Sequence, residues 1–119
     1  MNNFFALSGK YLLLFIFLSF FPLRKQNSVA CQVYKKNLAI IKARLDDKKD
    51  INLMNVYGAI LFFERLTDIR SHSPGGAAGQ FDPTNEDYIN WSNWFNKNQS
   101  KLYWDHNQQK VKIEDKKQH

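Results

Sequence analysis

The stretch YINWSNWFNKNQSKLYWD, residues 88–105, holds all three tryptophans of the chain and changes its periodicity halfway along. Tyr88, Trp91 and Phe95 recur at intervals of three and four, which is the spacing of one helical face. After the polar segment NKNQS, Leu102 and Trp104 alternate with other residues at a period of two, which is typical of a β-strand. The stretch therefore predicts a helix that leads into the first strand of a hairpin.

The rings of this stretch are expected to form the core of a small domain. A short chain has difficulty burying enough apolar surface, and each large ring can bury roughly 150–250 Å². Trp91 lies centrally on the ring-bearing face and should be buried, whereas Trp94 and Ile89 broaden that face and Trp94 should be less buried. The alternative is a carbohydrate platform, for which Trp94 and Tyr103 would be the ligand contacts.

The residues that flank this stretch predict where its helix begins and where its hairpin ends. Thr84 stands where a helix would start, and Asp87 three residues later predicts a capping box in the positive first turn. Beyond the polar turn DHNQQ (105–109), residues 110–114 alternate between charged and apolar, which completes a β-hairpin. Residues 115–119 should form a flexible tail.

Two further helices are predicted upstream. The first carries one apolar stripe, made of Cys31, Tyr34, Leu38, Ile41 and Leu45. The second, over residues 53–70, has a main stripe of Val56, Ala59, Ile60, Phe63 and Leu66, and further apolar side chains cover most of its other sides. Such a helix is typical of the centre of a bundle, and Gly58 would mark a close helix crossing. The Gly-rich segment 71–83 predicts a connecting loop without a phosphate-binding motif.

The first thirty residues differ from the remainder of the chain. Lys10 precedes an apolar run over residues 11–23, and the tripeptide Ser-Val-Ala at 28–30 has the small side chains that a signal peptidase accepts. The sequence therefore predicts export with cleavage between Ala30 and Cys31, so that the mature chain would begin at Cys31.

Two alternatives to a cleaved signal peptide stay open. In a lipoprotein, Cys31 would be the site of lipid attachment, and residues 29–31 resemble the end of a lipobox. In a retained membrane anchor, residues 4–23 would supply the roughly 20 residues that cross a bilayer, and Arg24 and Lys25 would favour retention. Each hypothesis places the protein in the periplasm, at the cell surface or at a membrane.

The charge and the cysteine content narrow the function classes. The whole chain has 17 Lys and Arg against 11 Asp and Glu, but Lys10, Arg24 and Lys25 belong to the first thirty residues. The remaining 89 residues keep 14 cations against 11 acids, a formal charge of +3. Such a small surplus with dispersed lysines argues against a nucleic-acid partner. Cys31 is the only cysteine, so no internal disulfide can form.

A longer pattern resembles a known type of small module. The segment FFERLTDI (62–69), a Gly-rich loop and then residues 84–105 are similar to uncharacterised small exported helical proteins of Bacteroidetes-like bacteria, and to tails that follow bacterial helical repeats. The matching positions are Leu66, Thr67, Trp91, Trp94, Phe95, Asn98, Leu102 and Trp104. Asp68 stands where that pattern usually has Gly. The resemblance implies an all-helical module with no established activity.

Residues that could carry chemistry are sparse. Asp68 and His72 stand four apart and His106 lies in the hairpin turn, but two such ligands do not define a metal site. Ser71 lies beside His72, yet no Gly-x-Ser-x-Gly motif surrounds it. We therefore predict no catalytic residue, no metal and no cofactor, and a hydrolase using His72 and Asp68 is the least favoured hypothesis.

Together these patterns predict a mainly α protein. Residues 1–30 would form the signal peptide or membrane anchor, residues 31–114 a three-helix domain with a short C-terminal β-hairpin, and residues 115–119 the tail. The expected function is a non-catalytic binding or structural module of the bacterial envelope that engages another protein, for example as an immunity-type or inhibitor protein. Carbohydrate or peptidoglycan binding through exposed aromatic rings is the alternative.

Overall fold

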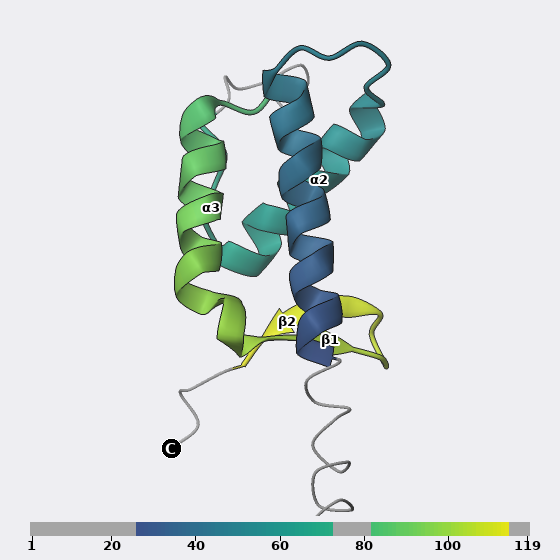
Figure 1. Cartoon of the computed structure of the whole chain (residues 1–119), viewed down its shortest axis with the longest axis vertical. Helices are drawn as coiled ribbons and strands as arrows, with labels where there is room; N and C mark the ends of the chain where they lie inside the picture. Colours follow the sequence, from purple (N-terminus) through teal and green to yellow (C-terminus); the bar gives the residue numbers. More distant parts are fainter. Residues whose placement is uncertain (1–25, 73–81, 115–119) are drawn as a thin grey trace, which may run out of the picture.

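A computed structural model describes residues 26–72 and 82–114 of the chain. Its elements are a helix over residues 26–45, α2 (Leu53–Thr67), α3 (Asn85–Asn98), the 3-10 turn η2 (Gln99–Lys101), and the strands β1 (Leu102–Asp105) and β2 (Lys110–Ile113). The helix over 26–45 and α3 lie side by side, α2 crosses behind them, and the hairpin closes one end of the bundle (Figure 1). The prediction of a mainly α fold with a C-terminal hairpin is confirmed.

The helix over residues 26–45 presents the predicted apolar stripe to the core. Tyr34 and Ile41 are fully buried, and the other members of the stripe pack partly buried against the core. The helix does not begin at Cys31, because residues 26–30 continue it without a break and Ala30 is fully buried.

Helix α2 is delimited by local backbone bonding. The side chain of Asn52 accepts hydrogen bonds from the first backbone N–H groups of the helix, which caps its start. The helix ends at Thr67 rather than at Arg70, because Asp68 adopts a left-handed conformation with φ 61°. Its backbone N–H donates to the carbonyl of Glu64, so Asp68 ends the helix in the conformation that a glycine commonly supplies.

Only one side of α2 is fully covered. Val56, Ala59, Ile60 and Phe63 are buried, whereas Leu66, Leu61 and Phe62 are half-buried. A β-carbon placed on Gly58 would meet no atom within 4 Å, so the prediction of a close helix crossing at this residue is wrong. The second apolar side of α2 therefore faces space that no other helix of residues 26–72 and 82–114 fills.

Helix α3 follows its sequence signals closely. Thr84 caps the helix and forms the predicted capping box with Asp87. Trp91 and Phe95 are buried and Trp94 is half-buried, as the spacing predicts. Ile89 is 55% exposed instead of joining the ring-bearing face. Residues that are two apart in a helix point in directions about 200° apart around its axis, so Ile89 lies on the side opposite Trp91.

The core is a cluster of stacked and edge-on rings. Tyr34 lies at its centre, with ring centroids 4.9 Å from Phe63, 4.8 Å from Phe95 and 5.7 Å from Trp94. Phe63 in turn stacks on Trp91 at 4.6 Å. The interpretation of Trp91 as a core residue is confirmed, since its side chain is fully buried among these rings.

The hairpin pairs Leu102 with Ile113 and Trp104 with Val111 in antiparallel register. Opposite partners share a face, so these four residues form the inner face, on which Leu102 and Val111 are buried. Tyr103, Asp105, Lys110 and Lys112 form the outer face.

Three predicted segments fall outside the described residues: the apolar run over 11–23, most of the Gly-rich loop and the tail over 115–119. Over residues 26–72 and 82–114, none of the helices combines the length and apolarity that a membrane crossing requires.

Candidate functional site

A groove of about 570 Å³ separates α2 from the second strand of the hairpin. Its α2 wall consists of Gly58, Leu61, Phe62, Arg65 and Leu66, and its other wall is the four consecutive residues of β2. We call this recess the α2–β2 groove. The C-terminal half of α2 approaches the hairpin in Figure 1, which places the groove at the hairpin end of the bundle.

The helix wall of the groove follows directly from the sequence of α2. Gly58, the pair 61–62 and the pair 65–66 recur at intervals of three and four, so they share one face of the helix. Because Gly58 has no side chain and no neighbour within 4 Å of its β-carbon position, the groove reaches the helix backbone there. Leu61, Phe62 and Leu66 give the rest of this wall an apolar character.

The strand wall of the groove is an edge rather than a face. Successive side chains of a strand point to opposite faces, yet all four residues of β2 line the groove. The groove therefore runs along the backbone of β2, which has only one partner strand in the described sheet.

Opposite residues of an antiparallel hairpin alternate between hydrogen-bonded and non-hydrogen-bonded pairs, and this alternation identifies the backbone groups of β2 that have no partner in β1. The N–H of Glu114 donates to the carbonyl of Lys101, so the hydrogen-bonded pairs that follow are Lys112 with Tyr103 and Lys110 with Asp105. The N–H and C=O groups of Val111 and Ile113 then point away from β1. Within the described part of the chain, no other segment bonds to them.

The rim of the groove is cationic. Arg65 and Lys110 are exposed, and no carboxylate of the described residues lies within ion-pair distance of either side chain. Lys112 pairs with Asp105 at 2.9 Å on the outer face of the hairpin. No acidic residue lines the groove itself, so its field favours an anionic ligand.

A second polar cluster surrounds the buried carboxylate of Asp87. Its two oxygens accept hydrogen bonds from the hydroxyl of Ser71 and from the backbone N–H groups of His72 and Thr84, and the ring Nδ1 of His72 lies 3.2 Å away. Burial alone would raise the pKa of Asp87, but these hydrogen bonds outweigh it and lower the pKa below its ordinary value.

The arrangement around Asp87 differs from a catalytic triad. In a triad the histidine stands between the nucleophile and the acid, so that it can take the proton of the nucleophile. Here Asp87 stands between Ser71 and His72 and holds both of them. His72 contacts Asp87, and among the described residues no hydrogen bond or ion pair joins it to Asp68, the partner that the hydrolase hypothesis requires.

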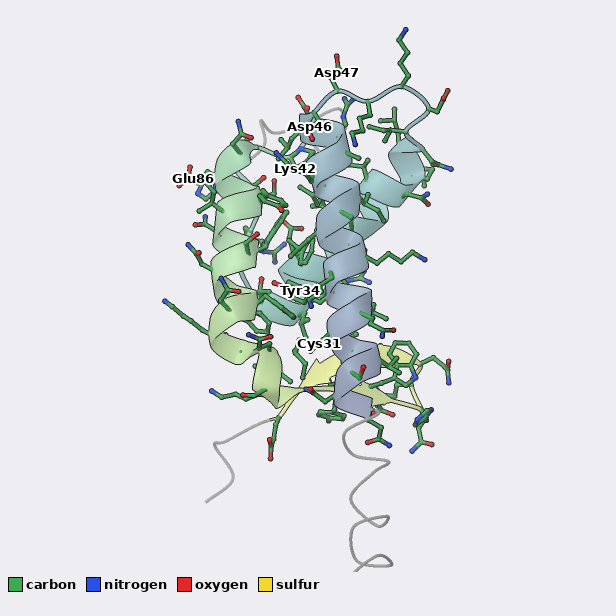
Figure 2. All side chains as sticks on the ribbon, in the orientation of Figure 1. Cys31, Tyr34, Lys42, Asp46, Asp47 and Glu86 are labelled. Carbon is green, nitrogen blue, oxygen red and sulfur yellow. The ribbon has the colours of Figure 1, made fainter. Side chains whose placement is uncertain are left out.

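The residues of the predicted processing site lie in a packed helix. Figure 2 shows Cys31 at the hairpin end of the helix over 26–45, with Tyr34 nearer the middle of the bundle. The side-chain amide of Asn27 donates to the carbonyls of Leu102 at 2.7 Å and Gln99 at 3.0 Å. The thiol of Cys31 lies 3.5 Å from the same Gln99 carbonyl. Burial raises the pKa of the Cys31 thiol, which disfavours the reactive thiolate.

The predicted carbohydrate contacts are only partly accessible. Trp94 is half-buried and stacks on Tyr34 with an interplanar angle of 8°, and Tyr103 is half-buried on the outer face of the hairpin. The exposed large apolar side chains of the described residues are Leu53, Met54 and Ile89, none of which is a ring. The same part of the chain contains no group of three His, Cys, Asp or Glu that could hold a metal ion.

Sequence reasoning missed the groove. The additional apolar residues of α2 were expected to be covered by a neighbouring helix, and the alternation of lysine with Val111 and Ile113 indicated only a strand. The available signal was Arg65, a charged residue on the same helical face as Gly58 and Leu61, because a fully covered face rarely carries an unpaired charge.

The fold and the groove define a small, mainly helical domain with an open, cation-rimmed recess. No protein-family model, curated protein or solved structure matches the chain. The resemblance to small exported bacterial modules therefore stays a prediction.

Proposed function

We propose that the protein is an exported, non-catalytic binding module of the bacterial envelope, and that it engages another protein through the α2–β2 groove. The observation that carries this proposal is the groove itself. Its apolar helix wall, its strand edge and its cationic rim are surface features that the packing of the described residues leaves unused.

A binding role is also consistent with the structural roles of the aromatic rings and of Asp87. The rings of the opening stretch pack around Tyr34, and Asp87 ties the segment after α2 to the start of α3. Carbohydrate or peptidoglycan binding through Trp94 and Tyr103 has weaker support, because both rings are half-buried. A hydrolase using Ser71 would need a base that takes the proton of its hydroxyl, and Asp87, which accepts the hydrogen bond of that hydroxyl, is a poor base because its other hydrogen bonds lower its pKa.

Within this proposal, a retained N-terminal segment is the form of attachment with the most support. Cleavage after Ala30 would remove a fully buried residue and the two hydrogen bonds that Asn27 makes to the hairpin end. Truncation is tolerated where the lost backbone is exposed and unbonded, and residues 27–30 do not meet that condition.

Site-specific photo-crosslinking in cells tests the proposed function. A photoreactive amino acid at position 58 should yield one defined adduct in the envelope fraction, because this position faces the open groove. The same amino acid at Lys36, which is exposed on the helix over 26–45, serves as the matched control and should yield no such adduct. Equal adducts from both positions, or none from position 58, would contradict the proposal, and a glycan adduct would favour the carbohydrate alternative.

A further inference from the structure

We infer that the partner binds the α2–β2 groove as an extended strand added to the free edge of β2, with apolar and acidic side chains in alternation. This inference rests on the proposed function and adds the geometry and the chemistry of the bound segment. It follows from three features of the groove, which are the unpaired backbone groups, the two-sided lining and the distribution of charge.

The unpaired backbone groups provide the hydrogen bonds. Val111 and Ile113 each direct an N–H and a C=O away from β1, so an incoming strand can form up to two pairs of main-chain bonds with this edge. An exposed strand edge is a template for strand addition, and main-chain bonds then supply affinity with little dependence on sequence. The edge is four residues long, so the paired part of the partner is correspondingly short.

The lining of the groove determines the side chains of the added strand. On one face of the extended sheet, its residues would lie beside Val111 and Ile113 and meet the α2 wall of Leu61, Phe62 and Leu66. On the other face, its residues would lie beside Lys110 and Lys112. Since successive side chains alternate between faces, apolar residues on the first face require polar ones on the second.

The charge of the rim selects acidic residues for that second face. Lys110 and Arg65 are exposed cations, and an adjacent strand brings its side chains within reach of Lys110 and Lys112. Lys112 already pairs with Asp105, whereas no carboxylate of residues 26–72 and 82–114 pairs with Lys110. An acidic residue opposite it would form a cross-strand pair of opposite charge.

A fatty acid is the competing occupant, because it also combines an apolar body with an anionic group. It has no N–H groups, however, so it can accept from Val111 and Ile113 but cannot satisfy their carbonyls. The unpaired edge therefore favours a peptide, and the two occupants differ in what they do to the backbone of β2.

The test uses the full chain in nanodiscs of zwitterionic lipid and the capped, fluorescent probe peptide Glu-Val-Glu-Val-Glu-Val-Glu. Fluorescence anisotropy measures binding, and amide hydrogen exchange locates it. We expect exchange at Val111 and Ile113 to slow on binding, whereas the amides of Lys110 and Lys112, which already bond to β1, should change little. These two lysine amides are the internal control for strand addition.

Three matched changes test the three features separately. N-methylation of alternate peptide residues on the pairing edge removes donors and should weaken binding about tenfold. Gly58→Leu should block the groove, whereas Gly58→Ala leaves most of it open. Lys110→Glu should weaken the binding of the acidic peptide and strengthen the binding of the basic peptide Lys-Val-Lys-Val-Lys-Val-Lys. The control Lys36→Glu, far from the groove in sequence, should change the binding of neither peptide.

Each contrary result has a distinct meaning. Equal binding of the N-methylated peptide, or protection that spares Val111 and Ile113, would overturn strand addition. Binding of sodium laurate with no binding of either peptide would also overturn it and assign the groove to a lipid. If these arms fail while crosslinking from position 58 still yields its protein adduct, the proposed function stands and only the strand geometry falls.

Discussion

The phenolic hydroxyl of Tyr34 donates a 2.7 Å hydrogen bond to the backbone carbonyl of Trp91, and both side chains are fully buried. This bond joins the helix over 26–45 to α3 at the centre of the ring cluster. Burial raises the pKa of Tyr34 well above its usual range, so the hydroxyl keeps its proton and remains a donor. The two residues stand 57 positions apart, and the sequence around either one does not predict their contact.

Tyr34→Phe should destabilise the protein by about 0.5–1.5 kcal/mol, because it removes one buried hydrogen bond and leaves the ring in place. Urea titration followed by circular dichroism measures the change in the free energy of unfolding. Tyr103→Phe is the matched control, since no hydrogen bond of its hydroxyl occurs among the described residues. An equal loss in both variants would contradict the assigned role of the Tyr34 hydroxyl.

Trp91→Ala should cost about 3–5 kcal/mol, which is the usual loss for a large buried ring, whereas Trp94→Ala should cost less. Trp91 is fully enclosed, and Trp94 is half-buried with one face stacked on Tyr34. Thermal unfolding of the two variants gives the comparison. Since small domains have only about 5–15 kcal/mol of stability in total, the melting of Trp91→Ala should be followed from low temperature. A Trp91→Ala protein with the wild-type melting temperature would refute the core assignment.

The stability of the protein should fall in acid partly through Asp87. Burial would raise its pKa, but the hydrogen bonds from Ser71, Thr84 and His72 lower it below the ordinary value of 3.8. Because the folded-state pKa is the lower one, the carboxylate stabilises the fold above that ordinary value. This contribution is lost as the pH falls through the folded-state pKa.

Urea titrations from about pH 2 to about pH 7 span the ordinary pKa of an aspartate and can isolate this effect. Asp87→Asn should be less stable than the wild type at pH 7, and the difference should shrink below about pH 4. The exposed neighbour Glu86 provides the control variant Glu86→Gln, which should follow the wild-type pH dependence. A difference for Asp87→Asn that is constant across the range would exclude titration of Asp87 as the cause.

The protein purified from cells should retain residues upstream of Cys31. Ala30 is fully buried and Asn27 bonds to two carbonyls at the start of the hairpin, so these residues belong to the folded domain. Intact-mass spectrometry gives the N-terminus. A mass that begins at Cys31 would support the cleaved signal peptide predicted from the tripeptide at 28–30, and a lipid adduct on Cys31 would identify a lipoprotein.

Gly58→Ala should stabilise the protein by about 0.5–1 kcal/mol, because the new β-carbon meets no atom within 4 Å and alanine favours a helix. The reverse change at an exposed position of the helix over 26–45, Ala39→Gly, should destabilise it by a similar amount. Chemical denaturation of both variants provides the measurement. Destabilisation by Gly58→Ala would mean that the space beside it is filled.

Elements whose signals are local could be predicted from the sequence. The capping box of Thr84 and Asp87, the ring spacing of α3 and the change to a period of two at Leu102 each arise from residues a few positions apart. Backbone hydrogen bonding in a helix or a hairpin acts over the same short range. The helix limits were less accurate, since the left-handed conformation of Asp68 ends α2 three residues before the predicted end.

The candidate site depended on contacts between distant segments. The sequence by itself determined which faces are apolar, where the rings concentrate and that Cys31 has no disulfide partner within the chain. Only the tertiary structure decided that Asp87 holds Ser71 and His72, that Asn27 joins the hairpin, and that one apolar face of α2 stays open beside β2. The physical reason is that periodicity specifies the direction of a side chain relative to its own helix or strand. Whether another element covers that side chain depends on how the whole core packs.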